Sequence, residues 1–326
     1  MYSKKLTILL CLKDRSEYSK SWIENNIFNE YNYIIADGSS DNRNAEIFNN
    51  ITHSNVRFLT YEYDQTIEIY LKKIIDAISK VKTPYIMRVD NDDILIQSGL
   101  EKCIKELERN SEYGVAHGNL RGIRIANNNL DSPRYKINPG LKEDYSDLIG
   151  LTGIAAIERL LCPYRMIWYG VYRTEIYKKI WNEIQESRLK NIFLIEILQS
   201  QLALIYTKLR YVNQTYYLRL SNPLSSTTLL NQTNDYPDWH KIFFNQEYRS
   251  EVNNMGIFIA RSLNEETSRI FEIYRYMYSS FGSNKDRIRN LLIKACKIII
   301  ASIVIFPIPK MSGSSIKKIF TLSNYF

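Results

Sequence analysis

Short apolar runs alternate with helical patterns in the first part of the chain. Apolar runs of strand length occupy residues 6–12, 33–36, 56–59 and 85–89. Unbroken hydrophobicity of this kind is typical of parallel strands that are covered on both faces. Between these runs, residues 17–26 and 65–80 place apolar side chains at helical spacing. The alternation predicts an α/β fold with a doubly wound, mostly parallel sheet and right-handed crossovers.

The second half of the chain is less regular. Residues 113–120, 167–175 and 216–221 predict further strands, and the second of these leads into a helix over residues 175–184. Residues 127–142, rich in Asn, Pro and Gly, lack periodicity and predict a mobile loop. From about residue 230 the pattern is helical, over residues 238–263 and 265–281. We therefore expect an α/β domain over residues 1–230 and a helical extension over residues 231–326.

Polar residues follow three of the predicted parallel strands at the point where each strand ends. These are residues 13–16, 37–41 and 90–93. Asp and Asn are also favoured in turns and at helix caps, so each group taken alone is weak evidence for a site. The carboxyl ends of parallel strands share one edge of the sheet, however, and ligands bind at that edge. The convergence of three such groups favours a ligand-binding crevice.

The group after the fourth strand carries three carboxylates, Asp90, Asp92 and Asp93. Like charges packed this closely repel one another unless a cation or several donors neutralise them. Two carboxylates separated by one residue suit Mg²⁺ or Mn²⁺, which also accepts phosphate oxygens of a substrate. A calcium loop of the EF-hand type is excluded, because Leu95 stands where that loop needs glycine. The pattern predicts a site for a metal and a diphosphate.

Two of these motifs resemble those of a known family. Residues 34–41 read Ile-Ile-Ala-Asp-Gly-Ser-Ser-Asp, and residues 83–93 read Thr-Pro-Tyr-Ile-Met-Arg-Val-Asp-Asn-Asp-Asp. In this order they resemble the family 2 type of GT-A glycosyltransferase, with the second motif in the place of that family's DxD sequence. The resemblance covers roughly residues 5–220. It implies a Rossmann-like GT-A fold, a nucleotide-sugar donor and a divalent metal, Mn²⁺ or Mg²⁺.

The resemblance also implies roles for individual residues. Asp37 would hold the nucleobase, Asp90 would lie near the ribose and the metal, and Asp92 would bind the metal on the donor diphosphate. Asp14, Arg15 and Arg88 are further candidates for donor binding. The first strand departs from the family pattern, since it ends in Leu-Lys-Asp-Arg where a Thr-Tyr-Asn-Arg type of sequence is frequent. A sugar-phosphate nucleotidyltransferase would have a glycine-rich loop there, and this chain has none.

Arg219 lies in the predicted strand at residues 216–221, which resembles the closing strand of the family. It could reach the donor diphosphate, or it could be an ordinary surface arginine.

Inverting sugar transfer needs a base that removes the proton from the acceptor hydroxyl. Glu196 is embedded in an apolar run, residues 192–198. Burial raises the pKa of a carboxyl and makes it a better base, so Glu196 is the leading candidate. The competing hypothesis is a structural glutamate in an ion pair. Glu175, Glu183 and Glu186 are weaker candidates for the base.

The composition restricts the partners and the location. The formal charge is +8, but the Lys and Arg residues are spread along the chain without a nucleic-acid motif, so no nucleic-acid partner is expected. Phosphorylated substrates or anionic lipid explain the charge equally well. The four cysteines are scattered, as in a cytoplasmic protein. No apolar run reaches the roughly 20 residues that span a bilayer.

Residues 287–306 combine cations with an apolar run and leave two interpretations open. They could form a helix in the interface of a membrane, which would make the protein peripheral on the inner face of the cell membrane. They could equally pack on the α/β domain or on a second copy in a homo-oligomer.

Together these observations predict a metal-dependent, inverting glycosyltransferase of the hexosyltransferase kind. Its expected setting is the synthesis of bacterial surface polysaccharide, with a glycan or lipid-linked glycan as the acceptor. The alternative is a catalytically degenerate GT-A-fold protein that binds nucleotide sugar or glycan without turnover.

Overall fold

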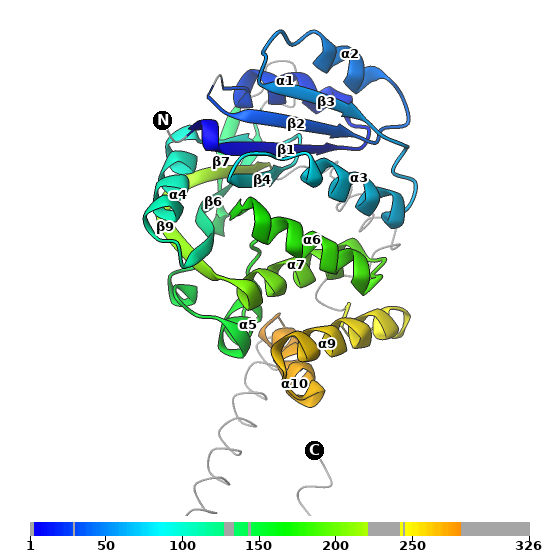
Figure 1. Ribbon diagram of the computed structural model, residues 1–326, viewed down its shortest axis with the longest axis vertical. Coiled ribbons are helices and arrows are strands. Elements are labelled where there is room, and N and C mark those ends of the chain that lie inside the picture. The colour runs from blue at the N-terminus through cyan, green and yellow to red at the C-terminus, as the bar shows by residue number, and fades with distance from the viewer. Residues whose placement is uncertain are drawn as a thin grey trace, which may run out of the picture. The chain divides into compact units, whose positions relative to one another are not determined.

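The computed structural model describes residues 3–28, 30–126, 134–142, 145–220, 242–243 and 245–281. Residues Met1–Tyr278 form one compact unit, and Ser279–Phe326 cluster separately. The predicted boundary at residue 230 and the amphipathic segment at residues 287–306 lie outside the described residues. Within the first unit the architecture is a mixed α/β sheet with helices on its faces, which confirms the predicted fold class (Figure 1).

One half of the sheet is parallel, as the apolar runs predict. Its strands stand in the order β3 (Val56–Thr60), β2 (Asn32–Asp37), β1 (Leu6–Leu12) and β4 (Tyr85–Val89). Register pairs such as Leu9↔Ile34 and Leu9↔Arg88 place β1 in the centre of this half. The ends of β1, β2 and β4 therefore lie on one edge.

The other half of the sheet is mixed. The short β8 (Val171–Arg173) is antiparallel to β4 and to the long β6 (Tyr113–Ile125). β9 (Lys208–Leu220) is parallel to β6, and β5 (Ile94–Leu95) is antiparallel to β9. β7 (Tyr135–Lys142) pairs with the end of β6. β5 directly follows the β4 loop in the chain, so its pairing with β9 brings this half of the sheet back to the carboxyl edge of β4.

Helices cover both faces of the parallel half. Aromatic contacts join α1 (Ser16–Asn26) and α2 (Arg43–Asn49) to one face, where Trp22 lies at 6.2 Å from Tyr33 and at 6.4 Å from Phe48 between ring centroids. The return crossover from β3 to β4 places α3 (Ile67–Ser79) on the opposite face, where it contacts α6 (Thr174–Ser187). This arrangement buries the central strands on both sides.

The remaining helices are α4 (Gln97–Arg109), α5 (Gly153–Leu161), α7 (Ile192–Tyr206), α9 (Arg249–Leu263) and α10 (Thr267–Phe281). Two sets of hydrogen bonds fix the start of α7. The Asn191 side chain accepts hydrogen bonds from the amides of Phe193 and Leu194, and Glu251 of α9 accepts from the amides of Lys190 and Asn191. In the described part of the chain, no helix has the length and apolar character needed to cross a membrane.

Two predictions about local structure were wrong. Residues 135–142, expected to belong to a mobile loop, form β7, because they find backbone partners on β6 that their own sequence does not reveal. The expected strand over residues 167–175 is restricted to Val171–Arg173. The chain turns before it, with the Gly170 amide donating to the Ile167 carbonyl at 3.1 Å.

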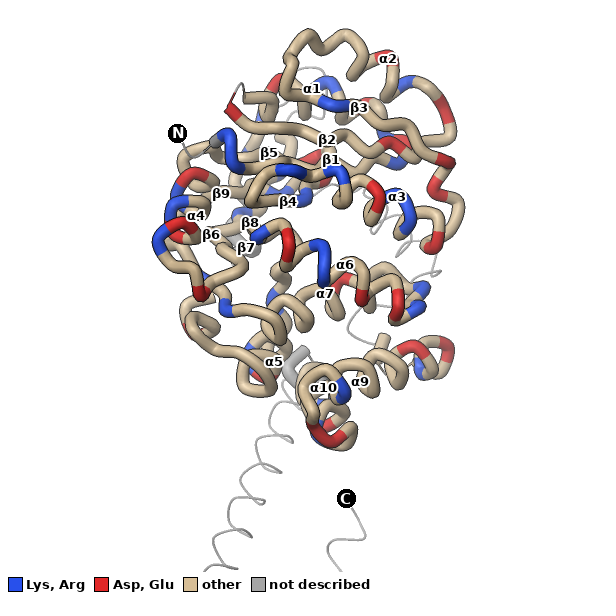
Figure 2. The backbone as a smooth tube through the Cα atoms, viewed as in Figure 1, with Lys and Arg blue, Asp and Glu red and all other residues tan. Residues whose placement is uncertain are grey.

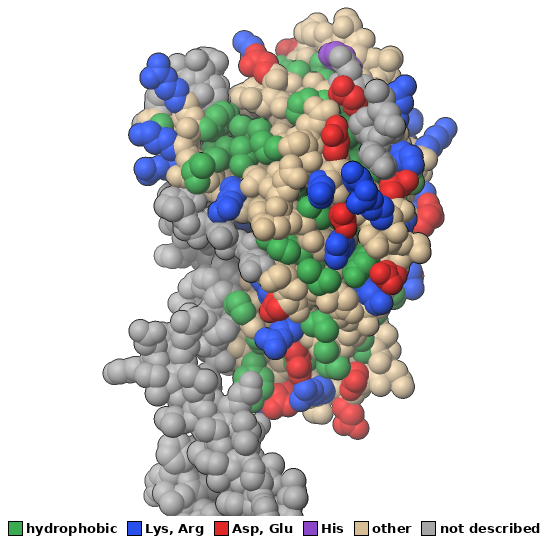
Figure 3. All heavy atoms as spheres, turned by 90° about the vertical axis from the view of Figure 1, so that its left-hand side faces the viewer, with side chains coloured by type: hydrophobic (Ala, Val, Ile, Leu, Met, Phe, Trp, Pro, Cys, Tyr) green, Lys and Arg blue, Asp and Glu red, His purple; other side chains and the backbone are tan. Residues whose placement is uncertain are grey.

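Basic and acidic residues are interspersed over most elements (Figure 2). Among the described large hydrophobic side chains, Ile137 of β7 is the most exposed, at 70%. Figure 3 looks onto the side of the molecule that carries β7, β9 and α4, where Lys and Arg side chains project next to a hydrophobic patch at one edge.

Candidate active site

Three loops meet at the carboxyl edge of β1, β2 and β4, as the parallel order predicts. The amide of Asp14 donates to Ser39 Oγ at 2.8 Å, which joins the β1 and β2 loops. Arg15 Nη2 lies 2.7 Å from Asp92 Oδ2, and the Asn91 side chain donates to the Arg15 carbonyl at 3.0 Å. The structure thus brings together five of the predicted site residues, which are Asp14, Arg15, Asp37, Asp90 and Asp92.

The loop after β1 has an unusual backbone. Asp14 and Arg15 have φ angles of 55° and 56°, in the left-handed region that non-glycine residues rarely adopt. Such residues cost on the order of 1–3 kcal/mol each and persist where their surroundings fix them. Here Asp14 Oδ1 accepts from the amide and the hydroxyl of Ser40, and Arg15 lies over the ring of Tyr18 and pairs with Asp92. Strain of this kind is typical of binding loops.

Asp37, at the end of β2, is buried and only 3% exposed. Its Oδ1 accepts from the hydroxyl and the amide of Ser39 at 2.5 and 3.2 Å. Burial raises the pKa of Asp37, and the bonds from Ser39 oppose part of that rise. The buried Asn44 supports the same loops by donating to Ser39 Oγ and to the Asp14 carbonyl. The Asp37 carboxyl is therefore held in one orientation at the crevice.

Asp64 and Lys73 form a buried ion pair beneath this loop that the sequence analysis did not single out. Lys73 also donates to the Leu12 carbonyl at 2.7 Å. The Asp64 amide donates to the Gly38 carbonyl, and a Cβ on Gly38 would lie only 2.6 Å from Asp64 Oδ1. Asp64 follows β3, so the carboxyl-edge rule applied to the third strand would have found it.

Replacement of Gly38 by alanine should destabilise the protein. The added Cβ meets a carboxylate that Lys73 holds in place, so the loop must shift, and we expect a loss of about 1–3 kcal/mol in the free energy of unfolding. Chemical denaturation measures this loss. Ser40→Ala in the same loop removes one exposed hydroxyl bond and should cost less than about 1 kcal/mol. Equal stability of the two variants would contradict the packing argument.

The three carboxylates after β4 have different surroundings. Asp93 is buried and accepts from the Tyr217 hydroxyl at 2.5 Å and the Leu220 amide at 2.8 Å. Its burial raises its pKa well above the ordinary range. The Asp90 and Asp92 side chains are 34% and 9% exposed, and burial also raises the pKa of Asp92. Asp93 therefore stabilises the fold, while Asp90 and Asp92 face the crevice.

Two stacked tyrosines orient this loop. The rings of Tyr169 and Tyr217 lie 4.5 Å apart at an interplanar angle of 25°. The Tyr169 hydroxyl donates to Asp90 Oδ2 at 2.6 Å, while the Tyr217 hydroxyl donates to Asp93. The two stacked tyrosines thus donate hydrogen bonds to two aspartates of the same loop, Asp90 and Asp93. The sequence analysis did not single out the hydroxyl of Tyr169.

Arg88 is buried within the sheet below Asp90. Its guanidinium lies 4.3 Å from the ring of Trp168, and Nη2 lies 3.6 Å from Asp90 Oδ1. Its Nε and Nη1 are buried without a hydrogen-bond partner among the described residues. The charge of Arg88 therefore acts on Asp90. A direct contact of Arg88 with the nucleotide-sugar donor stays a prediction.

Glu196 lies in the first half of α7, half-buried, and its Oε1 accepts from the Tyr164 hydroxyl at 2.9 Å. Burial raises the pKa of Glu196, and the nearby Arg219 guanidinium and the Tyr164 bond oppose part of that rise. Arg88 and Asp90 also act on its charge. The predicted base and Arg219 therefore lie within electrostatic reach of the β4 loop.

The three weaker candidates for the base have other surroundings. Glu175 is exposed and pairs with Lys178 on the same helix. Glu183 accepts from the Tyr206 hydroxyl, and Glu186 is exposed. Among the four glutamates that the sequence offered as the base, the arrangement favours Glu196.

The donor set fits a hard divalent cation only in part. Asp90 and Asp92 supply two carboxylates, but the described residues contain no group of three His, Cys, Asp or Glu side chains placed to hold a metal. Mg²⁺ commonly takes one or two carboxylates and completes its shell with substrate phosphates and water, so two suffice if a diphosphate is bound. For Asp92 to bind the metal, its ion pair with Arg15 would have to break.

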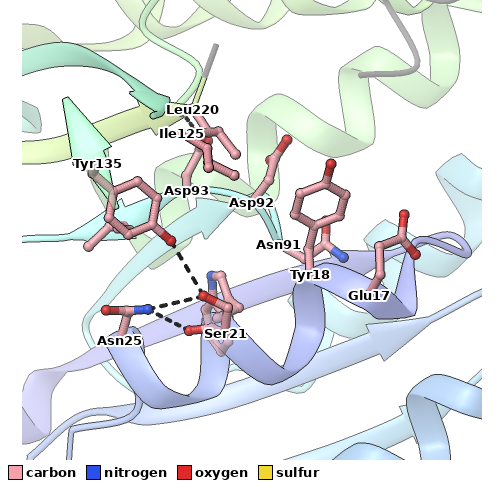
Figure 4. Close-up of a pocket in the computed structure, with 12 residues that line it drawn as sticks. Glu17, Tyr18, Ser21, Asn25, Asn91, Asp92, Asp93, Ile125, Tyr135 and Leu220 are labelled. Carbon is pink, nitrogen blue, oxygen red and sulfur yellow. Dashed lines mark hydrogen bonds between the residues drawn. The ribbon is translucent and has the colours of Figure 1, made fainter. Parts of the chain in front are cut away.

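A pocket lies next to Asp92 on the side of α1. Figure 4 shows Tyr18 of α1, Asp92 and Asp93 of the β4 loop, and Ile125 and Tyr135 of β6 and β7 around it. The Tyr135 hydroxyl lies 3.4 Å from Ser21 Oγ, which ties β7 to α1. The end of β6 and the start of β7 therefore adjoin the candidate site.

Comparison with known proteins identifies the fold. No protein-family model matches the chain, and no curated protein matches it in sequence. Among solved structures, it is similar to S. aureus TarS residues 1–349 in complex with UDP-GlcNAc, with a TM-score of 0.55 and 12% identity over 85% of this chain and 72% of that one. A second structure of TarS 1–349 gives a TM-score of 0.50 and 12% identity over 85% and 91% of the two chains. At this identity the likeness shows the fold alone, which is a GT-A-like α/β fold.

Proposed function

We propose that the protein is a glycosyltransferase that moves a sugar from a nucleotide diphosphate to a glycan or lipid-linked glycan, with inversion and with the help of a divalent metal. The observation that carries this proposal is the meeting of Arg15, Asp37 and Asp92 at the carboxyl edge of a GT-A-like sheet. Glu196 lies close enough for Asp90 of the same edge to act on its charge. The fold is shared with a TarS structure that contains UDP-GlcNAc, which makes a uridine diphosphate sugar the first donor to test. Synthesis of bacterial surface polysaccharide is the proposed setting.

The charges of the crevice support a diphosphate donor. Arg15 pairs with Asp92, and Arg219 lies close enough for Asp90 and Asp93 to stabilise its charge. Guanidinium groups bind phosphate oxygens in a planar, bidentate manner. The proposed ligands of the metal are Asp90 and Asp92, and a metal bound there would neutralise the charge of the departing diphosphate.

The proposed chemistry uses Glu196 as the base. Its carboxylate takes the proton of the acceptor hydroxyl while the acceptor oxygen forms a bond to the anomeric carbon of the donor. The bond between that carbon and the phosphate oxygen breaks, and its electron pair leaves with the nucleoside diphosphate. The Arg219 guanidinium and the hydrogen bond from Tyr164 oppose part of the rise that burial causes in the pKa of Glu196, and so favour its ionised form.

Two measurements on the full chain test the function. Thermal unfolding with UDP or UDP-GlcNAc should show protection when Mn²⁺ or Mg²⁺ is present and little protection in EDTA. Release of UDP from UDP-sugars, with and without added glycans, reports turnover. Protection without turnover over a wide acceptor range would favour the degenerate, binding-only protein, and absence of any protection would contradict the proposal.

Replacement of Asp37 by alanine should weaken donor binding more than it slows the chemical step. A contact with the nucleobase is made alike in the ground state and the transition state, so its loss raises KM and leaves kcat nearly unchanged. We expect the Kd for UDP to rise by about tenfold or more, as for the loss of a hydrogen bond to a charged group. Calorimetric titration measures it, with Asp41→Ala as an exposed control. An unchanged affinity would exclude Asp37 from the donor site.

A further inference from the structure

One segment of the chain, residues 164–172 and hereafter the linking segment, contacts two carboxylates on which the proposed chemistry depends. It follows α5 and runs into β8. The Tyr164 hydroxyl donates to Glu196 Oε1 at 2.9 Å, and the Tyr169 hydroxyl donates to Asp90 Oδ2 at 2.6 Å. The proposed base and a proposed ligand of the metal lie on different elements, α7 and the β4 loop, and yet they share one support.

Buried hydrogen bonds fix the backbone of the linking segment. The Ile167 amide donates to Ser200 Oγ at 3.2 Å. The Ile167 carbonyl accepts from the Tyr172 hydroxyl at 2.7 Å, and that hydroxyl accepts from Gln199 Nε2 at 2.8 Å. All four of these residues are fully buried. Because water does not reach them, the loss of one partner leaves a polar group unsatisfied, so the bonds hold the segment in place.

The anchors of the linking segment lie on the same face of α7 as the proposed base. Gln199 and Ser200 follow Glu196 by three and four positions, and residues at this spacing are neighbours on the surface of a helix. All three side chains form hydrogen bonds with the linking segment. One helix face therefore sets the position of the base and also of the segment that reaches Asp90.

The other end of the linking segment orients Asp90. Tyr169 is buried, its ring stacks on Tyr217, and its carbonyl accepts from the Tyr216 hydroxyl at 2.9 Å. Its own hydroxyl bonds one oxygen of Asp90, while Arg88 Nη2 lies 3.6 Å from the other oxygen. Each carboxylate oxygen can accept more than one bond, so Asp90 keeps acceptor sites for a cation. Neighbours on both oxygens thus restrict the orientation of this carboxylate.

A purely structural role for the Tyr169 hydroxyl is the competing explanation, and the exposure of Asp90 argues against it. Asp93 is buried and needs hydrogen bonds from the protein, whereas the Asp90 side chain is 34% exposed and could be hydrated instead. Carboxylates that bind metals are commonly oriented by hydrogen-bonded neighbours. The bond from Tyr169 is of that kind.

We propose that Tyr169 is a positioning residue that orients Asp90 for the metal, and that the linking segment couples Asp90 to Glu196. The proposal rests on the transferase function and deepens it, because it names the residues that set the metal ligand and the base relative to each other. Tyr169 acts through Asp90 and does not touch the substrates. A change at the anchor Ser200, which bonds neither carboxylate, should therefore disturb both.

Binding of Mn²⁺ to the full-length protein in the presence of UDP tests the positioning role without turnover. In titrations followed by the electron paramagnetic resonance of free Mn²⁺, Y169F should bind the metal about tenfold or more weakly than the wild type. Phenylalanine keeps the stack on Tyr217 and Asp90 can be hydrated, so the melting temperature should change little. The matched control is Y206F, which removes a hydroxyl that donates to Glu183 and should leave the affinity for Mn²⁺ unchanged.

S200A tests the coupling. It leaves the buried Ile167 amide without its acceptor, and we expect the affinity for Mn²⁺ and kcat at saturating Mn²⁺ each to fall about threefold or more per folded molecule. The matched control is Q201M, because Gln201 is also buried on α7 but bonds Tyr274 of α10. Both variants should lose stability, whereas Q201M should keep the Mn²⁺ affinity and the kcat of the wild type.

The outcomes separate the inference from the function on which it rests. Wild-type affinity for Mn²⁺ in Y169F would overturn the positioning role, and equal effects of S200A and Q201M would overturn the coupling. If Y169F does not fold, S200A decides, since it leaves the Tyr169 side chain in place. A wild type that binds no Mn²⁺ with UDP would refute the metal-dependent function and this inference together. A wild type that binds Mn²⁺, with all variants unchanged, would refute the inference alone.

Discussion

Asp92→Ala is expected to abolish both metal-dependent binding of UDP and sugar transfer, and to leave the fold intact. Removal of a metal ligand takes away several kcal/mol of stabilisation of the leaving diphosphate, so transfer should fall by at least about 10³-fold. The fold should survive because the partner of Asp92 is Arg15, whose side chain is 24% exposed and can turn to water. Because the Asp92 side chain is only 9% exposed, loss of the pair should cost some stability, but less than the about 3–5 kcal/mol of a fully buried pair. Full activity of the variant would remove the central claim.

The neighbouring Asp93→Ala is the matched control with the opposite expected result. Asp93 is buried, and its loss leaves the Tyr217 hydroxyl and the Leu220 amide without their acceptor. Each unsatisfied buried donor costs about 1–3 kcal/mol, so the melting temperature should fall clearly. Activity should fall with the folded fraction. Two adjacent aspartates with the same substitution thus separate a functional from a structural role in one experiment, and similar melting temperatures for both variants would contradict this division.

The parallel half of the fold could be predicted because its strands are buried on both faces and read as unbroken apolar runs. Leu6–Leu12 was predicted with its observed bounds. The mixed half was harder. β8 has only three residues, and β7 carries a 70%-exposed isoleucine, so neither shows a strand pattern of its own. Both strands exist because β6 supplies hydrogen-bond partners, and such non-local pairing does not appear in a local sequence pattern.

The candidate site was likewise predictable from the sequence only in part. Residues at the strand ends were found by topology, since Asp37 and Asp92 follow strands that the apolar pattern predicts. Lys73 was not found, because a lysine within an otherwise apolar helix face is ordinarily a solvated one, and only its contact with Asp64 shows that it is buried. The hydroxyl of Tyr169 was missed for a similar reason. Its bond to Asp90 joins residues far apart in the sequence.

The pH dependence of transfer should report the surroundings of Glu196. Burial raises the pKa of this carboxyl above its ordinary value of 4.5. A base acts only when it is unprotonated, so kcat should fall as the pH is lowered through the raised pKa, at a higher pH than for an exposed glutamate. Tyr164→Phe removes a hydrogen bond to the carboxylate and should move this acidic limb to still higher pH. A limb that stays in place would show that Tyr164 does not act on the base.

Glu196→Gln tests the base directly, because glutamine keeps the shape of the side chain but cannot accept the proton. If Glu196 is the base, kcat should fall by roughly 10²- to 10⁴-fold, the acidic limb should disappear, and the affinity for the donor should hardly change. Glu183→Gln, in which Tyr206 keeps a hydrogen-bond acceptor, is the control and should retain full activity. If Glu196 instead serves only to pair with Arg219, the same substitution leaves a buried cation without its partner, and the melting temperature should fall. A destabilised Glu196→Gln variant with normal turnover per folded molecule would therefore return the search for the base to Glu175, Glu183 and Glu186.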